Sequence, residues 1–178
     1  FLTPHLMEFS RLTSLTINEI LKDEIQIIKN FAKKYNLIIN VKSNISIISN
    51  GEDVIYNING NPSLAKGGSG DVLSGITLGL IAKSKNLIKS VAFASYILGR
   101  ASDLAILTIN ENSVLSSDII QNISNVLNEL QWFAIIFNMK KINFRNFNQY
   151  NFAKFAMITS YLLATLMLIT FCYNLFTI

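Results

Sequence analysis

The pattern of apolar and polar positions divides the chain into an α/β part and a mainly helical part. A helical period runs over residues 18–35, with apolar residues on one face and charged residues opposite. Residues 37–42 are mostly apolar and predict a strand that is buried on both faces. Residues 45–48 and 53–58 predict two more strands. Asn50-Gly51 between them predicts a hairpin, because both residues tolerate positive φ.

Segments before and after this region complete an α/β sandwich. Residues 1–5 read as the end of a strand that turns into a loop, and residues 8–15 as a short amphipathic stretch. Residues 71–83 predict a helix that is apolar on most sides, so we expect it to be buried. Residues 90–107 predict another helix. The last helix is expected to be capped by Ser117, with Asp118 in its first turn and an apolar face formed by Ile119, Ile123, Val126 and Leu130.

Composition narrows the class of function. Hydrophobic residues make up 51% of the 178 residues and the net charge is +4, but no face or stripe of Lys and Arg stands out. We therefore expect no nucleic-acid partner, because a solvated surface and a membrane flank account for the basic residues. One cysteine and one histidine exclude a disulfide within the chain, a cysteine zinc site and a histidine-rich cluster. No protein metal site is predicted.

Most of the excess of apolar residues lies after Leu130, which suggests that a different kind of segment begins there. Residues 1–130 form the predicted α/β domain, and residues 131–154 read as a basic and aromatic linker. Residues 155–178 contain no charged side chain. That length suffices for a transmembrane or other apolar helix, because a span needs roughly 20 residues. We expect this tail to be an unrelated fusion.

The strongest chemical signal is the glycine-rich segment 61–75. Gly67, Gly68 and Gly70 precede a predicted helix, so backbone N–H groups and the helix N-terminus can face one anion. Asp71 lies in the first helical turn, where a carboxylate can take a proton from a hydroxyl. An ordinary turn with Asp71 as a cap is the alternative. The segment matches neither a P-loop nor a dinucleotide fingerprint, because GK[ST] and the third glycine are missing.

Two weaker signals accompany this loop. The sequence TPHxxEFxRL places His5, Glu8 and Arg11 around a helix start, where they could bind phosphate or ribose. The alternative is a helix start with an ion pair between Glu8 and Arg11. The segment Lys42–Ser46 follows the buried strand, at the end where open α/β sheets bind ligands. An ordinary polar turn is its alternative.

The order and spacing of these three segments resemble the ADP- or ATP-dependent NAD(P)H-hydrate dehydratases of the ribokinase-like superfamily. The similarity extends over about residues 1–130 and is most specific in GNPSLAKGGSGDVLSG. It implies an α/β sandwich that lacks the N-terminal half of the family's domain. It also implies a lyase that repairs a damaged cofactor. The S epimer of NADH or NADPH hydrate would lose its added hydroxyl as phosphate, at the expense of ADP or ATP with Mg²⁺.

The resemblance also implies the roles of individual residues. Asp71 would be the catalytic carboxylate, and the amides of Gly67, Gly68, Ser69 and Gly70 would stabilise the transferring phosphoryl group. The hydrated nucleotide would lie against His5, Glu8, Arg11, Asn61 and Asp71. The ADP or ATP site would be lined by Lys42, Ser43, Asn44, Ile45 and Ser46. The implied partners are a second copy of the chain and an NAD(P)H-hydrate epimerase, and the implied compartment of the catalytic part is the cytoplasm.

Several departures from the family keep two alternatives open. KSNIS replaces the family's KGxxT, Lys66 stands where a small residue is usual, and Leu98 replaces a histidine. The chain is then either part of a working dehydratase or a non-catalytic remnant joined to a membrane segment. We expect the isolated chain not to restore NADPH from its hydrate. A small-molecule kinase of the same superfamily is a third hypothesis, although such kinases lack the contexts TPHxxEF and GNPSLAKGG.

Overall fold

The computed structural model describes residues 1–136, which belong to one compact unit. A three-stranded antiparallel sheet lies at its centre, in the order β1 (Ile39–Val41), β2 (Ser46–Ser49) and β3 (Val54–Asn57). Asn40 pairs with Ile48, and Ile48 pairs with Ile55. Residues 2–5 add a parallel segment beside β1, through bridges from Leu2 to Ile39 and from His5 to Lys42. The three predicted strands are confirmed within one or two residues.

The hairpin predicted at Asn50-Gly51 joins β2 and β3. Asn50 Oδ1 accepts hydrogen bonds from the N–H groups of Glu52 and Asp53, at 2.9 and 2.7 Å. Gly51 has φ +94°, and a Cβ there would lie 2.8 Å from the backbone of Lys33. Glycine therefore serves both the turn and the close approach of the neighbouring helix.

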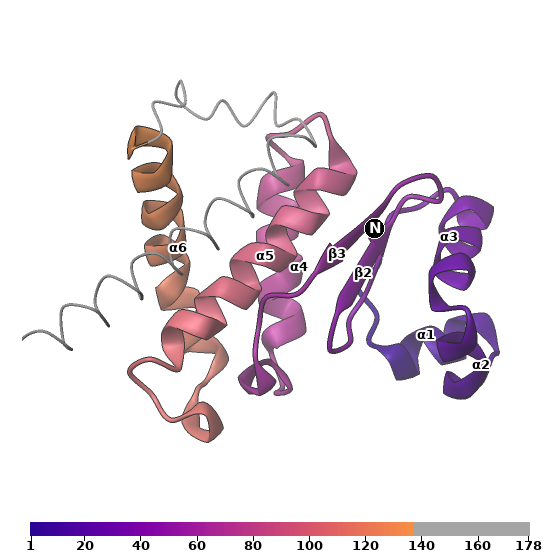
Figure 1. Ribbon diagram of the computed structural model, residues 1–178, viewed down its shortest axis with the longest axis horizontal. Coiled ribbons are helices and arrows are strands. Elements are labelled where there is room, and N and C mark those ends of the chain that lie inside the picture. The colour runs from indigo at the N-terminus through magenta and orange to yellow at the C-terminus, as the bar shows by residue number, and fades with distance from the viewer. Residues whose placement is uncertain (137–178) are drawn as a thin grey trace, which may run out of the picture. The chain divides into compact units, whose positions relative to one another are not determined.

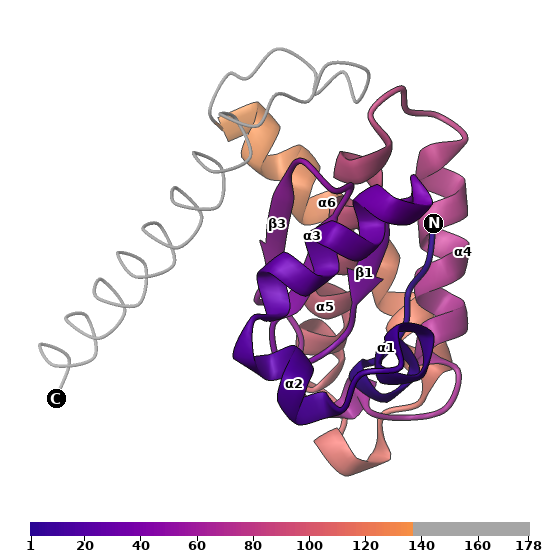
Figure 2. The same ribbon diagram turned by 90° about the vertical axis from the view of Figure 1, so that its right-hand side faces the viewer.

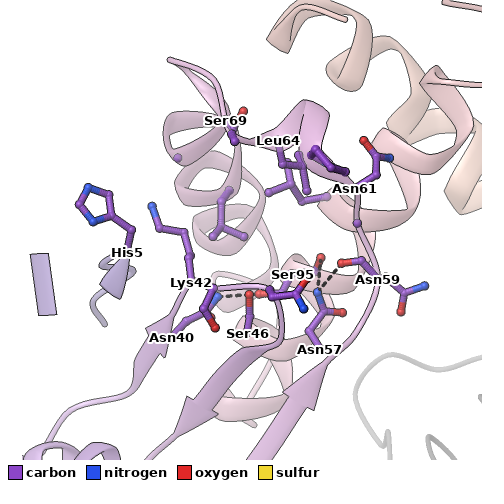
Figure 3. A pocket seen from close by; sticks show the side chains of 18 of the residues that line it. His5, Asn40, Lys42, Ser46, Asn57, Asn59, Asn61, Leu64, Ser69 and Ser95 are labelled. Atoms are coloured by element: carbon purple, nitrogen blue, oxygen red, sulfur yellow. Dashed lines mark hydrogen bonds between the residues drawn. The ribbon is translucent and has the colours of Figure 1, made fainter. Parts of the chain in front are cut away.

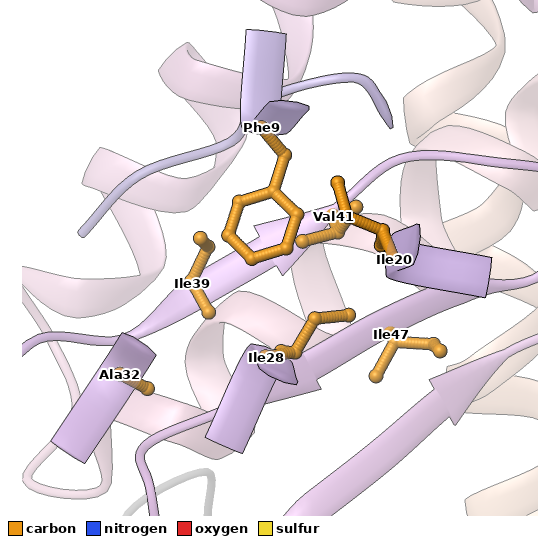
Figure 4. Close-up of a cluster of buried hydrophobic side chains, with 7 residues drawn as sticks. All are labelled: Phe9, Ile20, Ile28, Ala32, Ile39, Val41 and Ile47. Atoms are coloured by element: carbon orange, nitrogen blue, oxygen red, sulfur yellow. The ribbon is translucent and has the colours of Figure 1, made fainter. Parts of the chain in front are cut away.

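Helices cover both faces of the sheet (Figures 1 and 2). On one face lie α1 (Leu6–Thr13), α2 (Ile17–Lys22) and α3 (Glu24–Tyr35). They enclose a core cluster formed by Phe9, Ile20, Ile28, Ala32, Ile39, Val41 and Ile47 (Figure 4). On the other face, α5 (Leu87–Ala105) packs against β2 and β3, and also against α4 (Ser69–Ile81) and α6 (Ser116–Ile136). The expected α/β class is confirmed.

Alternation along β1 separates its side chains between the two faces. Ile39 and Val41 belong to the core beneath α1–α3, whereas the side chain of Asn40 is hydrogen-bonded to α5. All three residues are fully buried, as predicted for a strand covered on both faces. Lys42 follows on the same side as Asn40, and β1 thereby aims polar groups at one region.

The single helix predicted over residues 18–35 is wrong, because the structure has two. Asp23 has φ −149° and ψ 52°, outside the helical region. Its N–H closes α2 on the Ile20 carbonyl at 3.2 Å, and its own carbonyl accepts from Ile27 in the first turn of α3. Buried Ile20 and Ile28 are eight positions apart, so the break leaves the apolar period nearly undisturbed and the pattern does not reveal it.

Two expectations about the later helices also need correction. The helix predicted at 71–83 begins at Ser69, and it is not buried all round. Only Ser69, Leu73 and Thr77 are buried, whereas Leu78 is 60% exposed, because one stripe of α4 packs inward. Ser117 does not cap the last helix, which already includes Ser116. Asp118 instead accepts a hydrogen bond from the Leu115 N–H, at 2.8 Å.

The predicted boundary at residue 130 falls inside α6, which continues to Ile136. Most of the predicted linker and the whole apolar segment 155–178 lie outside the described residues. Two short 3-10 turns, η1 (Pro62–Leu64) and η2 (Glu111–Ser113), complete the described elements. Within residues 1–136, no helix combines the length and hydropathy that a membrane span requires.

Candidate active site

A cavity of about 660 Å³ opens where the carboxyl end of β1 meets the glycine-rich loop and α5. Its wall is made by three stretches of chain, together with His5, Leu73, Ser95 and Leu98. The stretches contribute Asn40, Lys42, Ser43, Asn44 and Ser46, then Asn57, Asn59, Gly60, Asn61, Pro62, Leu64, Ala65 and Lys66, and finally Ser69 and Gly70. Figure 3 shows these side chains around one hollow.

The parallel pairing at the N-terminus brings His5 beside Lys42. The Lys42 N–H donates to the Pro4 carbonyl at 2.8 Å, which aligns the start of α1 with the end of β1. His5 serves as N-cap of α1: its Nδ1 accepts from the Glu8 N–H at 3.1 Å, and Glu8 Oε2 accepts from the His5 N–H at 2.7 Å. The resulting capping box sets the direction in which α1 leaves the site.

Glu8 Oε1 lies 3.4 Å from His5 Nε2. Among the described residues Glu8 forms no ion pair with Arg11, so that part of the alternative interpretation is wrong. The hydrogen bond from the His5 N–H holds the pKa of Glu8 below its ordinary value, and the charges of His5, Lys42 and Arg11 act in the same direction. Glu8 and Arg11 do not line the cavity. Of the three residues in this motif, only His5 reaches it.

The turn after β1 contributes most of its predicted residues. Lys42, Ser43, Asn44 and Ser46 line the cavity, whereas Ile45 is 45% exposed and does not. Ser43, which replaces the glycine of KGxxT, donates from Oγ to the Ile45 carbonyl at 2.6 Å within this turn. The Lys42 ammonium reaches across to the glycine-rich loop. A Cβ on Gly70 would lie 3.4 Å from its Nζ.

The three glycines of the loop have different roles. Gly68 is the N-cap of α4 with φ +90°, and a Cβ there would lie 2.8 Å from Ser116 Oγ. Gly70 leaves room for Lys42, whereas a Cβ on Gly67 would meet no atom within 4 Å. No side chain caps the N-terminus of α4. The Ser69 N–H donates to the Lys66 carbonyl at 3.5 Å, so the N–H groups that follow it in the first turn are the ones available to an anion beside the Lys42 ammonium.

Asp71 is the third residue of α4 and follows Gly70 directly. Its side chain is exposed and is not part of the cavity wall; Gly67 and Gly68 are not part of it either. A carboxylate in the first turn is stabilised by the helix dipole, and the exposed side chain of Asp71 is accessible. Its catalytic role remains a prediction.

Asn61 lines the cavity, but both ends of its amide are engaged within the protein. Nδ2 donates to Asp103 Oδ1 at 3.0 Å, and Oδ1 accepts from the Ser63 N–H at 3.0 Å as the cap of η1. Asp103 in α5 thus holds the loop that carries Asn61. A Cβ on nearby Gly99 would lie 2.5 Å from the Asn59 carbonyl oxygen, so glycine allows α5 to approach this loop closely.

Sequence reasoning missed several cavity residues. Lys66 Nζ donates to the carbonyls of Asn112 and Val114 at 2.8 and 2.7 Å, so this lysine ties the loop to η2. Asn40 Nδ2 donates to Ser95 Oγ at 2.6 Å. The signal for Asn40 was present as one polar residue in an apolar strand, two positions before Lys42. Its partner in α5 is visible only in the fold.

Among residues 1–136, no group of three or more His, Cys, Asp or Glu side chains could hold a metal ion. A divalent cation can also be held by fewer protein ligands together with ligands of a bound molecule. Phosphate oxygens are such ligands, because Mg²⁺ commonly combines few protein carboxylates with substrate phosphates.

Comparison with known proteins agrees with this geometry. The profile of the NAD(P)H-hydrate dehydratase family matches residues 1–125. A Bacillus subtilis protein named ADP-dependent (S)-NAD(P)H-hydrate dehydratase is 36% identical over 104 residues, which are 58% of this chain and 38% of the relative.

Two solved structures share the fold. The ADP/ATP-dependent NAD(P)H-hydrate dehydratase from B. subtilis, co-crystallised with ATP/Mg²⁺, is 30% identical with a TM-score of 0.68, over 71% of this chain and 46% of the other. A ribokinase-like superfamily protein from Enterococcus faecalis is 31% identical with a TM-score of 0.63, over 71% of this chain and 43% of the other.

The chain spans less than half the length of these relatives. The match nevertheless includes every segment that lines the cavity, from His5 to Leu98. The chain belongs to the NAD(P)H-hydrate dehydratase family.

Proposed function

We propose that this chain carries the nucleotide-binding and proton-abstracting residues of an ADP- or ATP-dependent NAD(P)H-hydrate dehydratase. The observation that carries the proposal is the convergence of the Lys42 ammonium and the uncapped N-terminus of α4 at one cavity, with Asp71 in the same helical turn. Two positive features beside one carboxylate suit a reaction that moves a phosphoryl group onto a hydroxyl.

The nucleotide's phosphates would lie beside the Lys42 ammonium and the N-terminus of α4, and its nucleoside along the turn from Ser43 to Ser46. Mg²⁺ fits this arrangement as an ion carried in by the phosphates, whose charge it would reduce. The Gly68 conformation turns the first N–H groups of α4 toward the transferring phosphoryl group. Those amides would stabilise charge that develops on its oxygens.

Asp71 would take the proton from the added hydroxyl of the hydrated nicotinamide ring. The hydroxyl oxygen would then bond to the terminal phosphorus as the bond from that phosphorus to the nucleotide's bridging oxygen breaks. Elimination would break the ring's C–O bond and a C–H bond on the adjacent ring carbon. Phosphate and a proton would leave, and the new double bond would restore the dihydronicotinamide. The hydrated nucleotide would approach from the side of His5, with Glu8 and Arg11 at the rim and Asn61 close to both ligands.

The direct test is a binding measurement with the 178-residue chain. Titration calorimetry should detect ADP or ATP in the presence of Mg²⁺, and Lys42→Met should lower the affinity at least tenfold. Lys83→Met is the matched control, because Lys83 is exposed in the turn after α4 and should not alter affinity. Absence of nucleotide binding by the folded wild type would refute the proposal.

Catalysis is tested separately. The sequence-based expectation is that the isolated chain gives no turnover of (S)-NADPH hydrate, followed by the absorbance of the reduced cofactor. A chimera in which residues 1–125 replace the matching part of the B. subtilis dehydratase should be active. Asp71→Asn should lower its turnover by about 10²–10⁴-fold while keeping nucleotide affinity. An inactive but folded chimera that binds ADP would support the non-catalytic remnant.

The partners follow from the same proposal. An enzyme that acts on one epimer needs a reaction that interconverts the two, so an NAD(P)H-hydrate epimerase would supply its substrate. A second copy of this chain is the other proposed partner.

The small-molecule kinase remains the second candidate, because GSGD beside a phosphate site also suits phosphoryl transfer to an alcohol. A screen of hydroxyl acceptors with ATP, in which a stable phosphorylated product accumulates, would favour it.

A further inference from the structure

Asn40 is a buried polar residue that the proposed chemistry does not use. It is 0% exposed and lies between Ile39 and Val41, which face the opposite core. Its Nδ2 donates to Ser95 Oγ at 2.6 Å, and Ser95 Oγ in turn donates to the Val91 carbonyl at 3.2 Å. This chain of donors holds the amide in one orientation.

The other end of the same amide is unsatisfied. Among the described residues, Asn40 Oδ1 has no hydrogen-bond partner, although it is buried and the residue lines the 660 Å³ cavity. A buried carbonyl oxygen without a partner costs free energy, so native structures usually satisfy it by protein, water or ligand. One N–H of the amide is engaged by Ser95, and within residues 1–136 the amide atom left without any partner is Oδ1, which is an acceptor.

The place of Asn40 relative to Lys42 indicates which part of a ligand it meets. Residues two apart on a strand share a face and are separated by about 7 Å. Figure 3 shows the Lys42 ammonium on the side of His5 and Ser69, and Asn40 at the other end, beside Ser95 and Ser46. A nucleotide held by its phosphates at Lys42 would have its sugar, the next group along the molecule, near Asn40.

We propose that Asn40 Oδ1 accepts a hydrogen bond from a ribose hydroxyl of the bound adenine nucleotide, and so selects ribonucleotides. This inference rests on the proposed nucleotide site. A phosphate oxygen cannot be the partner, because it would place two acceptors together. The amino group of the base is a donor, but it lies at the far end of the nucleoside, beyond the span from Lys42 to Asn40. Ser95 is the positioning residue that keeps the acceptor in place.

The test compares four probes: ADP, its 2′-deoxy and 3′-deoxy analogues, and inorganic pyrophosphate. The wild-type 178-residue chain should bind one deoxy analogue about three- to tenfold more weakly than ADP, as expected for one lost hydrogen bond. Asn40→Val should bind ADP and that analogue equally. Pyrophosphate should bind both proteins alike, which shows that the phosphate end is intact. Ser95→Ala should reduce the discrimination by freeing the amide to rotate.

Several results would overturn the inference. Equal binding of ADP and both deoxy analogues by the wild type would mean that Oδ1 meets only water. Discrimination that persists in Asn40→Val would assign the hydroxyl contact to another residue. If the wild type binds pyrophosphate but does not distinguish ADP from its deoxy analogues, only this inference is refuted. If neither ADP nor pyrophosphate binds, the proposed nucleotide site is refuted as well. Asn40→Ala serves in the same comparison if circular dichroism shows that Asn40→Val does not fold.

Discussion

The ammonium of Lys66 lies 2.7 Å from the backbone carbonyl oxygen of Val114, 48 residues further along the chain. The same nitrogen also reaches the carbonyls of Asn112 and Glu111, at 2.8 and 3.3 Å. One side chain therefore satisfies several backbone acceptors in a turn that has few partners of its own. It also joins the glycine-rich loop to the start of α6.

Lys66→Met should lower the free energy of unfolding by about 2 kcal/mol, because backbone carbonyl oxygens lose the charged hydrogen-bond donor that now satisfies them. Urea denaturation followed by circular dichroism measures the effect. Lys83→Met, which removes an exposed lysine from the turn after α4, should change stability by less than about 0.5 kcal/mol. Equal effects of the two substitutions would contradict a structural role for the Lys66 contacts.

Gly99→Ala should destabilise the protein by about 2 kcal/mol, because the added Cβ overlaps the backbone of the neighbouring loop. That Cβ would lie 2.5 Å from the Asn59 carbonyl oxygen, and Asn59 lines the cavity. Nucleotide affinity should therefore fall together with stability. Gly75→Ala is the matched helical control: its Cβ meets nothing within 4 Å, so it should stabilise by up to about 1 kcal/mol.

Gly68→Ala and Gly67→Ala should differ, although the two glycines are adjacent. Gly68 has φ +90° and faces Ser116, whereas a Cβ on Gly67 meets open space. We expect the first substitution to cost at least about 1–2 kcal/mol, the strain of a left-handed residue, and the second to be within about 0.5 kcal/mol of neutral. Thermal unfolding separates the two. A larger loss from Gly67→Ala would show that the loop adopts another conformation.

Acid should weaken the N-terminal helices. Hydrogen bonds from His5 and Thr16 lower the pKa values of Glu8 and Glu19 below their ordinary value of 4.5. Because a lowered carboxylate pKa stabilises the folded state above the unfolded pKa, this contribution disappears as the pH falls below 4.5. Burial raises the pKa of Glu24, so its charged form destabilises the folded state. Protonation of Glu24 in acid therefore increases stability.

The measurement for this pH dependence is urea unfolding at several pH values between neutrality and acid. A double variant, Glu8→Gln with Glu19→Gln, should lose less stability on acidification than the wild type, although it begins from a lower value. If the wild type and the double variant lost the same free energy of unfolding between neutral and acid pH, the two capping carboxylates would not contribute to the pH dependence.

Local patterns predicted the sheet, because each strand of the hairpin carries its own apolar run and its own turn residues. They did not predict the break at Asp23, since the periods of α2 and α3 continue through it. The exposure of Leu78 was also missed, because the composition of α4 does not show which neighbours cover it. Helix burial depends on tertiary contacts, which are absent from a one-dimensional pattern.

The site was partly predictable for the same reason. His5, Lys42 and Ser46 belong to short motifs whose order along the chain indicated neighbouring ligand sites, and the fold brings them together. Asn40 and Lys66 gave weaker signals, because their roles depend on partners in α5 and η2 that lie far away in sequence. Glu8 and Arg11 share the His5 motif but point outside the cavity wall, since the capping box directs them along α1.

The parallel pairing of residues 2–5 with β1 has a consequence for the order in which the cavity forms. The hairpin of β2 and β3 closes short loops, whereas the bridge from His5 to Lys42 joins residues separated by three helices, at a greater entropic cost. In native-state hydrogen exchange, the amides of Asn40 and Lys42, which are bonded to Leu2 and Pro4, should open before those of the hairpin. The His5 wall would then detach as a unit, and the cavity would open first beside Lys42.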